Sequence, residues 1–521
     1  MMERGLWCLL LVALSLSCAV GGWAGDCTQF GCDARHSNYT SETVSFPLSL
    51  EWKFSNPPDT SLTAPVVAEN SVFWTAGPYI FGIDQETGAA RWGCKAPALV
   101  NGCAFYAGTV IFLTDDGYLY ALRSGDGQVA WQAKVARSAH SAVALEGDTI
   151  YCATTDNQVL ALEAATGRTK WSTEIKDVVY AAPAVAAGRV YVSCMDNQVY
   201  AFDAQNGKLQ WNYRMPTRAG VHMEPVAGDR YLYVVTEKTL SAVGFRGVPG
   251  WRLDFRADLP AGPSYANGLV YQPGPDGVIY ALEADTGKVR WRQPAGMYLS
   301  CGVTVAGDVL LTGSDSGLVR AYEAQMGLPL WEYHTWHPLL VKASRRKEDF
   351  VPVVPPVVAN GALYISTAGG ELLKLSPNAF DGAPPEAFNL APEEGKPTSG
   401  ALPLKIGAQV FDEGSGLDTR SLSLTLDGQA LPASFSAVGS AFFHSKATGA
   451  LDDGWHTAEI KAKDNRGNEM VRTWKFLVDK GYSAPAQAQS AATGATATQQ
   501  PEVPPGPSGQ GSGLSFGRRR D

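Results

Sequence analysis

Tryptophan recurs at a nearly constant interval along much of the chain. The spacings between successive members of the series are 40, 39, 40, 40, 40, 40 and 40 residues. From the second member onward, each tryptophan stands four residues after a glycine. A fixed period in this range is the signature of a repeat architecture, in which each unit repeats one packing arrangement. The series consists of Trp52, Trp92, Trp131, Trp171, Trp211, Trp251, Trp291 and Trp331.

Each period has the pattern of four short strands. Asp116-Gly117 and Asp276-Gly277 recur at one phase and predict tight hairpin turns, and glycines such as Gly188 mark a second turn before them. Apolar alternating runs, for example 189–193 and 198–202, lie between the turns. The chain's 55 glycines and 32 prolines agree with many turns. Four strands in about 40 residues is the pattern of a β-propeller blade.

The strand pattern also predicts how the ring closes. Seven of eight predicted third strands are followed by a Gly-x-x-x-Trp fourth strand, but the eighth, 372–376, is followed by proline. The segment 48–54 around Trp52 supplies the missing strand, which removes the free sheet edges. The sequence therefore predicts an all-β fold with an eight-bladed propeller over residues 25–380.

The C-terminal third has a different pattern. Residues 377–400 are rich in proline, alanine and glutamate and predict a connector, whereas 402–478 alternate apolar and polar residues. We expect an immunoglobulin-like β-sandwich over residues 381–480, followed by a disordered tail over 481–521. Aspartates beside glycines favour turn formation in this domain, with calcium binding as the alternative. These aspartates are Asp412, Asp427 and Asp464.

The N-terminus predicts export. Residues 1–24 contain Arg4, a short apolar stretch and a small-x-small site at Gly22-Trp23-Ala24, as in a signal peptide. The alternative is a lipoprotein signal with the lipid anchor on Cys18, although the residues before Cys18 match that signal poorly. Beyond this segment there is no apolar run of 18 residues, so no transmembrane span is expected.

Seven cysteines follow the predicted cleavage site, which leaves at least one without an intramolecular partner. Cys27 with Cys32, and Cys94 with Cys103, are close enough in sequence to form disulfides. Cys152 and Cys194 lie within apolar strand patterns and are expected to be buried thiols. The chain has no Cys-x-x-Cys motif, so neither a zinc ribbon nor a thioredoxin-type site is predicted.

The repeat resembles that of a known family. The segments Ala161–Trp171 and Ala281–Trp291 approach the pattern Ala-x-Asp-x-x-Thr-Gly-x-x-x-Trp, which is similar to the tryptophan-docking repeat of pyrroloquinoline-quinone-type propellers. That family includes quinoprotein alcohol dehydrogenases and the propeller lipoprotein of the outer-membrane assembly machine (BamB). Residues 29–37 also resemble the segment that often precedes the first strand in such proteins. The resemblance implies the fold, whereas function depends on the site each member carries.

Resemblance to the dehydrogenases implies a quinone stacked between a tryptophan and a disulfide of adjacent cysteines, beside calcium and a catalytic aspartate. No two cysteines are adjacent in this chain, and no aspartate matches the catalytic one. We therefore expect no catalytic residue, no cofactor and no resident metal, with pyrroloquinoline quinone or calcium as the alternative. The net charge of −9 argues against nucleic acid as a partner.

One loop departs from the repeat. The step from the seventh to the eighth predicted blade is longer than the others, and it combines aromatic and basic residues in the segment 334–349. His334-x-x-His337 lacks a third ligand, so no metal site is predicted there. We expect this loop to be exposed and to bind a partner. The predicted partner-binding residues are His334, Trp336, His337, Arg345, Arg346 and Lys347.

These features together predict a non-enzymatic protein of the cell envelope, located in the periplasm, at the outer membrane or on the cell surface. Its predicted role is that of a scaffold that binds proteins or envelope polymers. The alternatives are a pyrroloquinoline-quinone-dependent dehydrogenase and an outer-membrane protein assembly factor similar to BamB.

Overall fold

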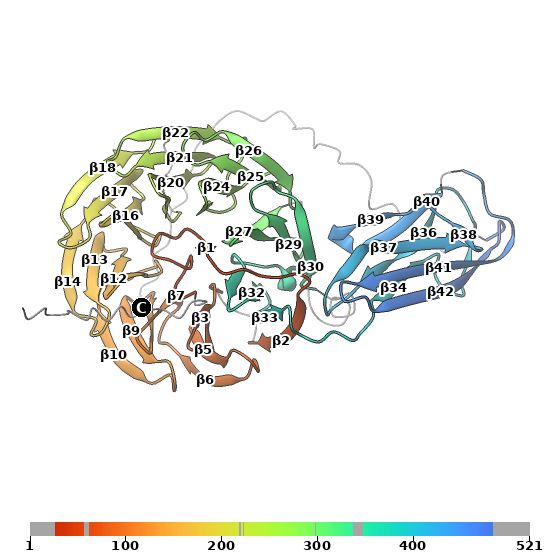
Figure 1. Cartoon of the computed structure of the whole chain (residues 1–521), viewed down its shortest axis with the longest axis horizontal. Helices are drawn as coiled ribbons and strands as arrows, with labels where there is room; N and C mark the ends of the chain where they lie inside the picture. Colours follow the sequence, from red (N-terminus) through yellow and green to blue (C-terminus); the bar gives the residue numbers. More distant parts are fainter. Residues whose placement is uncertain are drawn as a thin grey trace, which may run out of the picture.

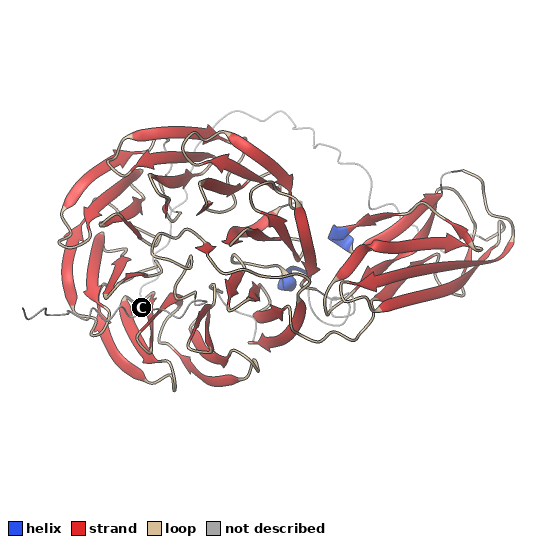
Figure 2. Ribbon diagram, in the orientation of Figure 1, coloured by secondary structure: helices blue, strands red, loops and turns tan. Residues whose placement is uncertain are grey.

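A computed structural model describes residues 27–56, 62–217, 220–221, 223–296, 298–336, 347–446 and 448–482. The predicted signal peptide, Cys18 and nearly all of the predicted tail lie outside these residues. The regular secondary structure of the described chain is almost entirely β-strand (Figure 2), with two short 3₁₀ helices, η1 (Lys347–Phe350) and η2 (Ala437–Gly439). Neither helix has the length or the apolar character needed to cross a membrane.

Eight sheets stand around a ring in the described part of residues 39–376 (Figure 1). In seven of these sheets the first of four consecutive strands lies toward the centre of the ring and the fourth at its rim. The first four sheets are β3 (Val66–Ala68), β4 (Ser71–Ala76), β5 (Tyr79–Asp84) and β6 (Ala90–Lys95); β7 (Val100–Tyr106), β8 (Thr109–Thr114), β9 (Tyr118–Arg123) and β10 (Val129–Lys134); β11 (Ala144–Glu146), β12 (Thr149–Ala153), β13 (Gln158–Glu163) and β14 (Thr169–Glu174); and β15 (Ala184–Ala186), β16 (Arg189–Cys194), β17 (Gln198–Asp203) and β18 (Leu209–Arg214).

The next three sheets repeat this order, and one of them gains a short parallel strand, β1 (Tyr39–Thr40), beside its inner strand β27 (Leu299–Ala306). They are β19 (Val226–Ala227), β20 (Tyr231–Thr236), β21 (Thr239–Gly244) and β22 (Pro249–Asp254); β23 (Ser264–Ala266), β24 (Leu269–Pro273), β25 (Val278–Glu283) and β26 (Val289–Pro294); and β27 (Leu299–Ala306), β28 (Val309–Ser314), β29 (Leu318–Glu323) and β30 (Pro329–His334).

The eighth sheet joins the two ends of the repeat region. Its order is β2 (Ser49–Ser55), β33 (Glu371–Ser376), β32 (Ala362–Thr367) and β31 (Val357–Ala359). β2 is antiparallel to β33, with Ser49 opposite Ser376 and Ser55 opposite Glu371. The predicted closure by an N-terminal strand is therefore confirmed in the described residues.

The repeating tryptophans couple neighbouring sheets. The buried ring of Trp171 lies against Gly207, which has φ +71° and belongs to the turn before the outer strand of the following sheet. A Cβ at Gly207 would stand 2.6 Å from that ring, so only glycine fits there. The indole Nε1 of Trp171 also donates to the carbonyl of Ala204, at 3.0 Å. The same donation to the following sheet is made by Trp52, Trp92, Trp211, Trp251 and Trp291.

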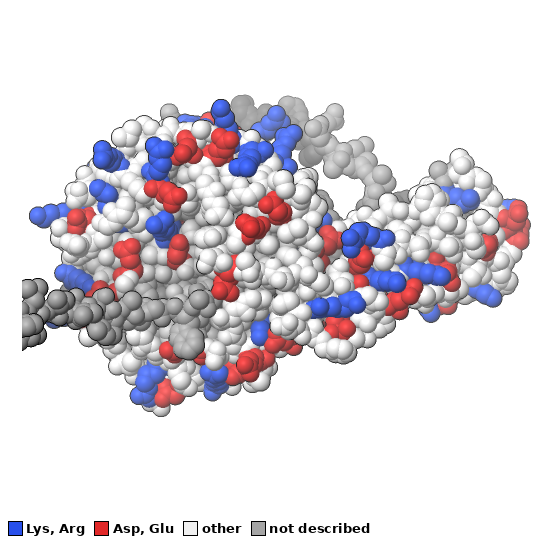
Figure 3. Space-filling model, viewed as in Figure 1, with Lys and Arg blue, Asp and Glu red and all other residues white. Residues whose placement is uncertain are grey.

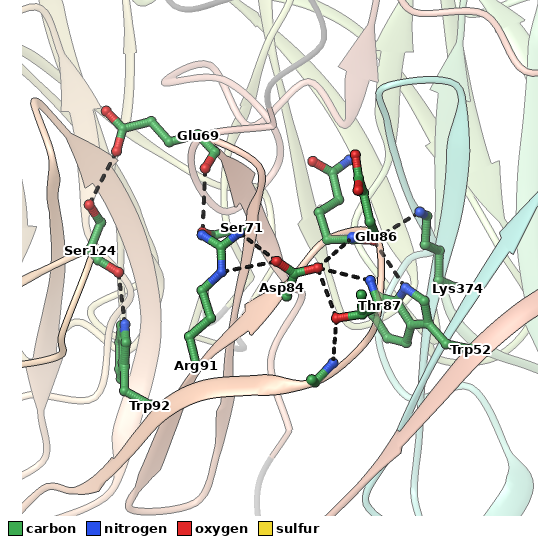
Figure 4. A network of polar contacts seen from close by, with 12 residues as sticks. Trp52, Glu69, Ser71, Asp84, Glu86, Thr87, Arg91, Trp92, Ser124 and Lys374 are labelled. Carbon is green, nitrogen blue, oxygen red and sulfur yellow. Dashed lines mark hydrogen bonds and ion pairs between the residues drawn. The ribbon is translucent and has the colours of Figure 1, made fainter.

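Figure 4 shows this contact at the first sheet, where Trp52 Nε1 donates to the carbonyl of Gln85. The turn itself is held by Asp84, which accepts hydrogen bonds from the amide and the hydroxyl of Thr87 and pairs with Arg91 at 2.6 Å. Arg91 and Thr87 hold the pKa of Asp84 below its usual range. The Asp-x-x-Thr-Gly part of the repeat thus shapes the turn on which the preceding tryptophan rests.

The last tryptophan of the series has a different environment. Trp331 is followed by a sheet that lacks the Thr-Gly turn, and its ring stacks on Phe46 at 5.3 Å between centroids. Pro377 stands where the other units supply the acceptor, but its carbonyl accepts from Arg466 of the C-terminal domain. Nε1 of Trp331 has no partner among the described residues.

The N-terminal segment 27–40 fills the centre of the ring (Figure 1). In seven sheets, one backbone amide of the inner strand donates to an acceptor in this segment, and the acceptors follow the order of the sheets along the chain. Without the segment these amides would be buried without partners. Gln29 uses its side chain, which both accepts from the amide of Leu145 and donates to its carbonyl. The seven amides belong to Val67, Phe105, Leu145, Val185, Ala227, Tyr265 and Val305. We call residues 27–40 the hub.

The hub is internally braced. Cys27 and Cys32 form a disulfide, one of the two pairings that the spacing allowed. The amide and the hydroxyl of Ser37 donate to Asp33, at 2.9 and 2.8 Å. His36 is fully buried against Phe30, and burial lowers its pKa to about 4, so it is neutral at pH 7.

Two further sheets form the C-terminal domain around one apolar core. The first is β34 (Glu386–Ala391), β36 (Leu404–Phe411), β40 (Ala441–Lys446) and β39 (Ser434–Ser436); the second is β35 (Pro397–Thr398), β42 (Glu469–Val478), β41 (Gly454–Asp464), β37 (Leu417–Leu426) and β38 (Gln429–Ala430). Trp474, Phe476 and Ile460 of the second sheet pack against Ile406 and Val410 of the first. β34 and β35 lie inside 377–400, so describing that whole segment as a connector was wrong.

We predict that Trp171→Ala lowers the free energy of unfolding of the ring by about 3–5 kcal/mol, the usual cost of truncating a buried aromatic residue. Urea unfolding followed by circular dichroism measures this. Trp455→Ala is the control, because Trp455 is 60% exposed in the C-terminal domain. An unfolding curve of the Trp171 variant that matched the wild type would contradict the coupling role of the tryptophans.

We also predict opposite outcomes for two truncations. Removing residues 381–521 leaves a folded ring, because β2 and the hub remain. Removing 25–55 takes away both, exposes the outer edge of β33 and leaves the inner amides unpaired, so the protein aggregates. Size-exclusion chromatography and circular dichroism distinguish the two, and a folded, monomeric product of the N-terminal truncation would refute the closure.

Candidate functional site

The two ends of the ring carry different connections. Because neighbouring strands are antiparallel, the turns between second and third strands and the connections between sheets lie at the same end. We call this end the loop face. The hub bonds near the opposite end of the inner strands, where Gly307 donates to Thr40.

A polar and aromatic cluster joins three sheets on the loop face. Asp115 follows β8, and its Oδ1 lies 2.9 Å from Nδ1 of His140, in the connection from β10 to β11. The amide of Asn101, on β7, donates to the same carboxylate at 2.9 Å and to the carbonyl of Ala139 at 3.0 Å. The ring of Tyr180, in the connection from β14 to β15, stacks on His140 with centroids 6.0 Å apart. These contacts hold His140 in one orientation.

This cluster suits recognition better than catalysis. Nε2 of His140 lies 3.4 Å from the hydroxyl of Ser138, which completes the order carboxylate, imidazole, hydroxyl. That separation exceeds the 2.6–3.2 Å expected of an activated nucleophile. Tyr180 is 43% exposed and Leu99, whose carbonyl accepts from the amide of Asp115, is also exposed. We call Leu99, Asn101, Asp115, His140 and Tyr180 the loop-face patch.

Sequence reasoning did not find this patch. Its signal is weak but present: His140 and Tyr180 are one repeat of 40 residues apart, at a phase that holds Gly220 and Pro260 further on. An aromatic side chain at that phase is not needed to form the repeat. Tyr298, in the connection from β26 to β27, is another exposed aromatic residue of the loop face.

Two residues of the predicted partner loop, His334 and Trp336, are buried and not exposed as expected. Trp336 is 5% exposed, so the prediction that it offers exposed apolar area is wrong. Its ring packs on Phe411 of the C-terminal domain, with centroids 6.1 Å apart. His334 is also buried, and its Nε2 donates to the carbonyl of Ala437 at 2.6 Å. Both residues bind the chain's own second domain.

The structure does not test the prediction for the other residues of that loop. His337, Arg345 and Arg346 lie outside the described residues, and Lys347 begins η1. A role for this part of the loop in binding an external partner stays a prediction.

Further contacts fix the C-terminal domain beside the ring, next to β30 and β2 (Figure 1). The amide of Leu50 donates to the carbonyl of Gly414 at 3.0 Å, and the hydroxyl of Tyr333 donates to that of Glu413 at 2.9 Å. Lys53 pairs with the Glu413 carboxylate at 3.2 Å. Phe411, Glu413 and Gly414 all belong to one stretch, the end of β36 and the loop that follows it.

A cleft of about 480 Å³ lies between the outer strands of the ring and the start of β37. Its charged groups are paired within their own domains: Arg320 with Glu332 at 3.4 Å, and Arg420 with Asp418 at 2.9 Å. Acidic and basic side chains also alternate over the described surface seen in Figure 3. Neither feature singles out a ligand of one charge.

The alternative considered above was a quinone site, and the described residues do not reproduce the stacking platform that it requires. The hub occupies the inner strand edges, and its disulfide joins cysteines five positions apart. The other described cysteines are free thiols, so the second pairing that the spacing allowed, Cys94 with Cys103, does not form. Cys152 and Cys194 are buried, as predicted.

Parts of this chain are similar in sequence to known propeller-forming proteins. The chain is 31% identical over 148 residues to the outer membrane protein assembly factor BamB of Moranella endobia, covering 26% of this chain and 34% of that protein. It is 30% identical over 135 residues to BamB of Shewanella oneidensis, covering 23% and 32%. The chain thus spans about a third of the length of these curated relatives in each match.

Solved structures show the same fold at low identity. BamB from Moraxella catarrhalis aligns with a TM-score of 0.52 and 18% identity over 63% of this chain and 99% of that chain. The quinohemoprotein alcohol dehydrogenase ADHIIG from Pseudomonas putida HK5 aligns with a TM-score of 0.58 and 14% identity over 72% and 83%.

A family described as outer membrane protein assembly factor BamB matches the repeat region in four overlapping segments, residues 49–144, 115–243, 214–296 and 275–382. These segments cover more than half of the chain and coincide with the ring of sheets. The chain therefore belongs to this family of β-propeller repeat proteins.

Proposed function

We propose that this protein is an exported, non-enzymatic scaffold of the cell envelope that binds another protein through the loop-face patch. In this proposal residues 1–24 are a signal peptide, 25–380 an eight-bladed propeller, 381–480 an immunoglobulin-like domain and 481–521 a disordered tail. The names of the relatives place them in outer-membrane protein assembly, and we extend that envelope setting to this chain.

The observation that carries the proposal is the contrast between the centre and the loop face of the ring. At the centre, the hub uses the inner amides of seven sheets for the chain's own structure. On the loop face, an ordered network presents the exposed ring of Tyr180 and the edge of His140. An aromatic anchor held rigidly and surrounded by polar groups is the arrangement typical of protein interfaces.

An outer-membrane protein assembly factor is a more specific form of this proposal. The names of the relatives support its cellular setting, and the fold of the ring is compatible with it. The alternative of a dehydrogenase is tested by adding pyrroloquinoline quinone with calcium and assaying dye reduction on alcohols and sugars. We expect no turnover.

A fluorophosphonate probe tests whether Ser138 is a nucleophile. We expect it to leave Ser138 unlabelled, and labelling that required His140 would show that the cluster is catalytic.

We predict that a photo-crosslinking amino acid at position 180 captures a discrete envelope protein in the living cell, whereas one at position 455 does not. Position 455 is the matched control, because Trp455 is an exposed aromatic residue on the C-terminal domain. Crosslinked products are resolved on a denaturing gel and identified by mass spectrometry. Capture from 455 alone would move the site to the C-terminal domain and contradict the proposal.

For the captured partner, His140→Ala combined with Tyr180→Ala should weaken binding by about tenfold or more, as expected when an interface anchor is truncated. Neither side chain belongs to the core of the ring, so the melting temperature should stay near that of the wild type. Unchanged affinity in the folded double variant would exclude the patch as the binding site.

A further inference from the structure

Three carboxylates converge in the C-terminal domain, next to its contact with the ring. Asp381 comes from the linker after β33, Asp412 follows β36, and Asp464 ends β41. One oxygen of each lies within 4.8 Å of the others. Oxygens that bind one calcium ion at about 2.4 Å are at most about 4.8 Å apart, so this spacing allows all three to bind a single ion.

Amide groups donate to this cluster, but no positively charged side chain of the described residues pairs with it. Asp412 is 5% exposed and accepts from the amide of Gly416, and Asp464 is 2% exposed and accepts from the backbone amides of Arg466 and Asn468 and the side-chain amide of Asn468. The neighbouring Arg466 is directed to Ser49 and Pro377 instead. Buried charges that lack a partner are costly, and a bound cation is one way proteins neutralise them.

A second observation comes from the loop beside the cluster. Ser415 is completely buried, and its amide donates to the carboxylate of Asp381 at 2.7 Å. Its carbonyl accepts from Asn465, but its hydroxyl has no hydrogen-bond partner in the described chain. A buried hydroxyl normally finds one. The unpaired hydroxyl thus belongs to the same residue whose backbone amide binds the Asp381 carboxylate.

Gly414 shows how closely the linker approaches this loop. A Cβ at that position would lie 2.3–2.4 Å from the carboxyl atoms of Asp381. Glycine is therefore what allows the Asp381 carboxylate to reach the other two.

We propose that Asp381, Asp412 and Asp464, together with the hydroxyl of Ser415, form a binding site for a calcium ion. Hard oxygen ligands in an irregular arrangement, completed by water, are those that calcium prefers, whereas magnesium requires a nearly ideal octahedron. This inference concerns the C-terminal domain and does not depend on the proposed function.

The position of the site gives the ion a structural role. The loop that carries Asp412 and Ser415 also carries Glu413 and Gly414, which contact Tyr333 and Leu50 of the ring. The turn after Asp464 carries Arg466, which contacts Ser49. A bound ion ties the linker to both loops, and thereby fixes the C-terminal domain against the ring.

The test uses the full exported chain after removal of divalent ions with a chelator. Titration with calcium chloride in a calorimeter should show one saturable site, and scanning calorimetry should show a higher melting temperature with calcium. Asp412→Asn should weaken binding by about 100-fold or more. Asp418→Asn is the control, because Asp418 lies nearby but pairs with Arg420, and it should bind as the wild type does.

Three further measurements distinguish an ion-binding site from a cluster of carboxylates that binds no ion. If no ion binds, Asp412→Asn stabilises the protein equally with and without calcium, because it removes repulsion between carboxylates; that result would overturn the proposal. Ser415→Ala should weaken calcium binding without lowering the melting temperature of the ion-free protein, and unchanged binding would remove Ser415 from the site. Magnesium that bound as tightly as calcium would overturn the choice of ion.

Discussion

The contact between each repeating tryptophan and the turn of the following sheet is the interaction on which the ring depends. A single sheet of four short strands has too little core to be stable alone, and the indole gives it both apolar area and a hydrogen bond to its neighbour. The glycine under the ring, with its positive φ, leaves no room for any other side chain. Each unit is coupled to the next through its tryptophan. Trp131 keeps the contact with the glycine but its indole makes no hydrogen bond within the described chain, and at Trp331, beside the C-terminal domain, the glycine turn is also missing.

The hub solves the second problem that such a ring creates. Inner strands arranged around a centre leave one edge of each sheet without a partner, and buried amides need acceptors. A single N-terminal segment supplies acceptors to seven sheets in the order in which they occur along the chain. Because the sheets are built alike, their inner strands present equivalent backbone amides at the same height in the ring. One segment at the centre is therefore able to bind all seven. Variation is consequently concentrated on the loop face and at the contact with the second domain.

The repeat period carried most of the information about the ring. Strand positions, turns and the closing role of β2 followed from spacing, because each is set by local sequence and recurs many times. The errors concern contacts between distant segments. Trp336 lies in a long loop with basic residues and has the composition of an exposed surface, yet Phe411, far along the chain, covers it. β34 was missed because its neighbour in the sheet, β36, and not its own composition, makes it a strand. Asp381 stands alone in the linker, so no local pattern links it to Asp412 and Asp464.

The hub also determines the order in which the chain is able to fold. Its residues are made before the strands to which their acceptors bind, for example Asn38 before Val305. β2 likewise precedes its partner β33, with Ser49 opposite Ser376. Contacts between such distant parts of a chain give a high contact order and slow folding. Until the last sheet is available, the inner amides and the outer edge of β33 stay open to other chains. We therefore expect partly folded chains of this protein to aggregate with one another when they are concentrated. We also expect the ring to close late and cooperatively.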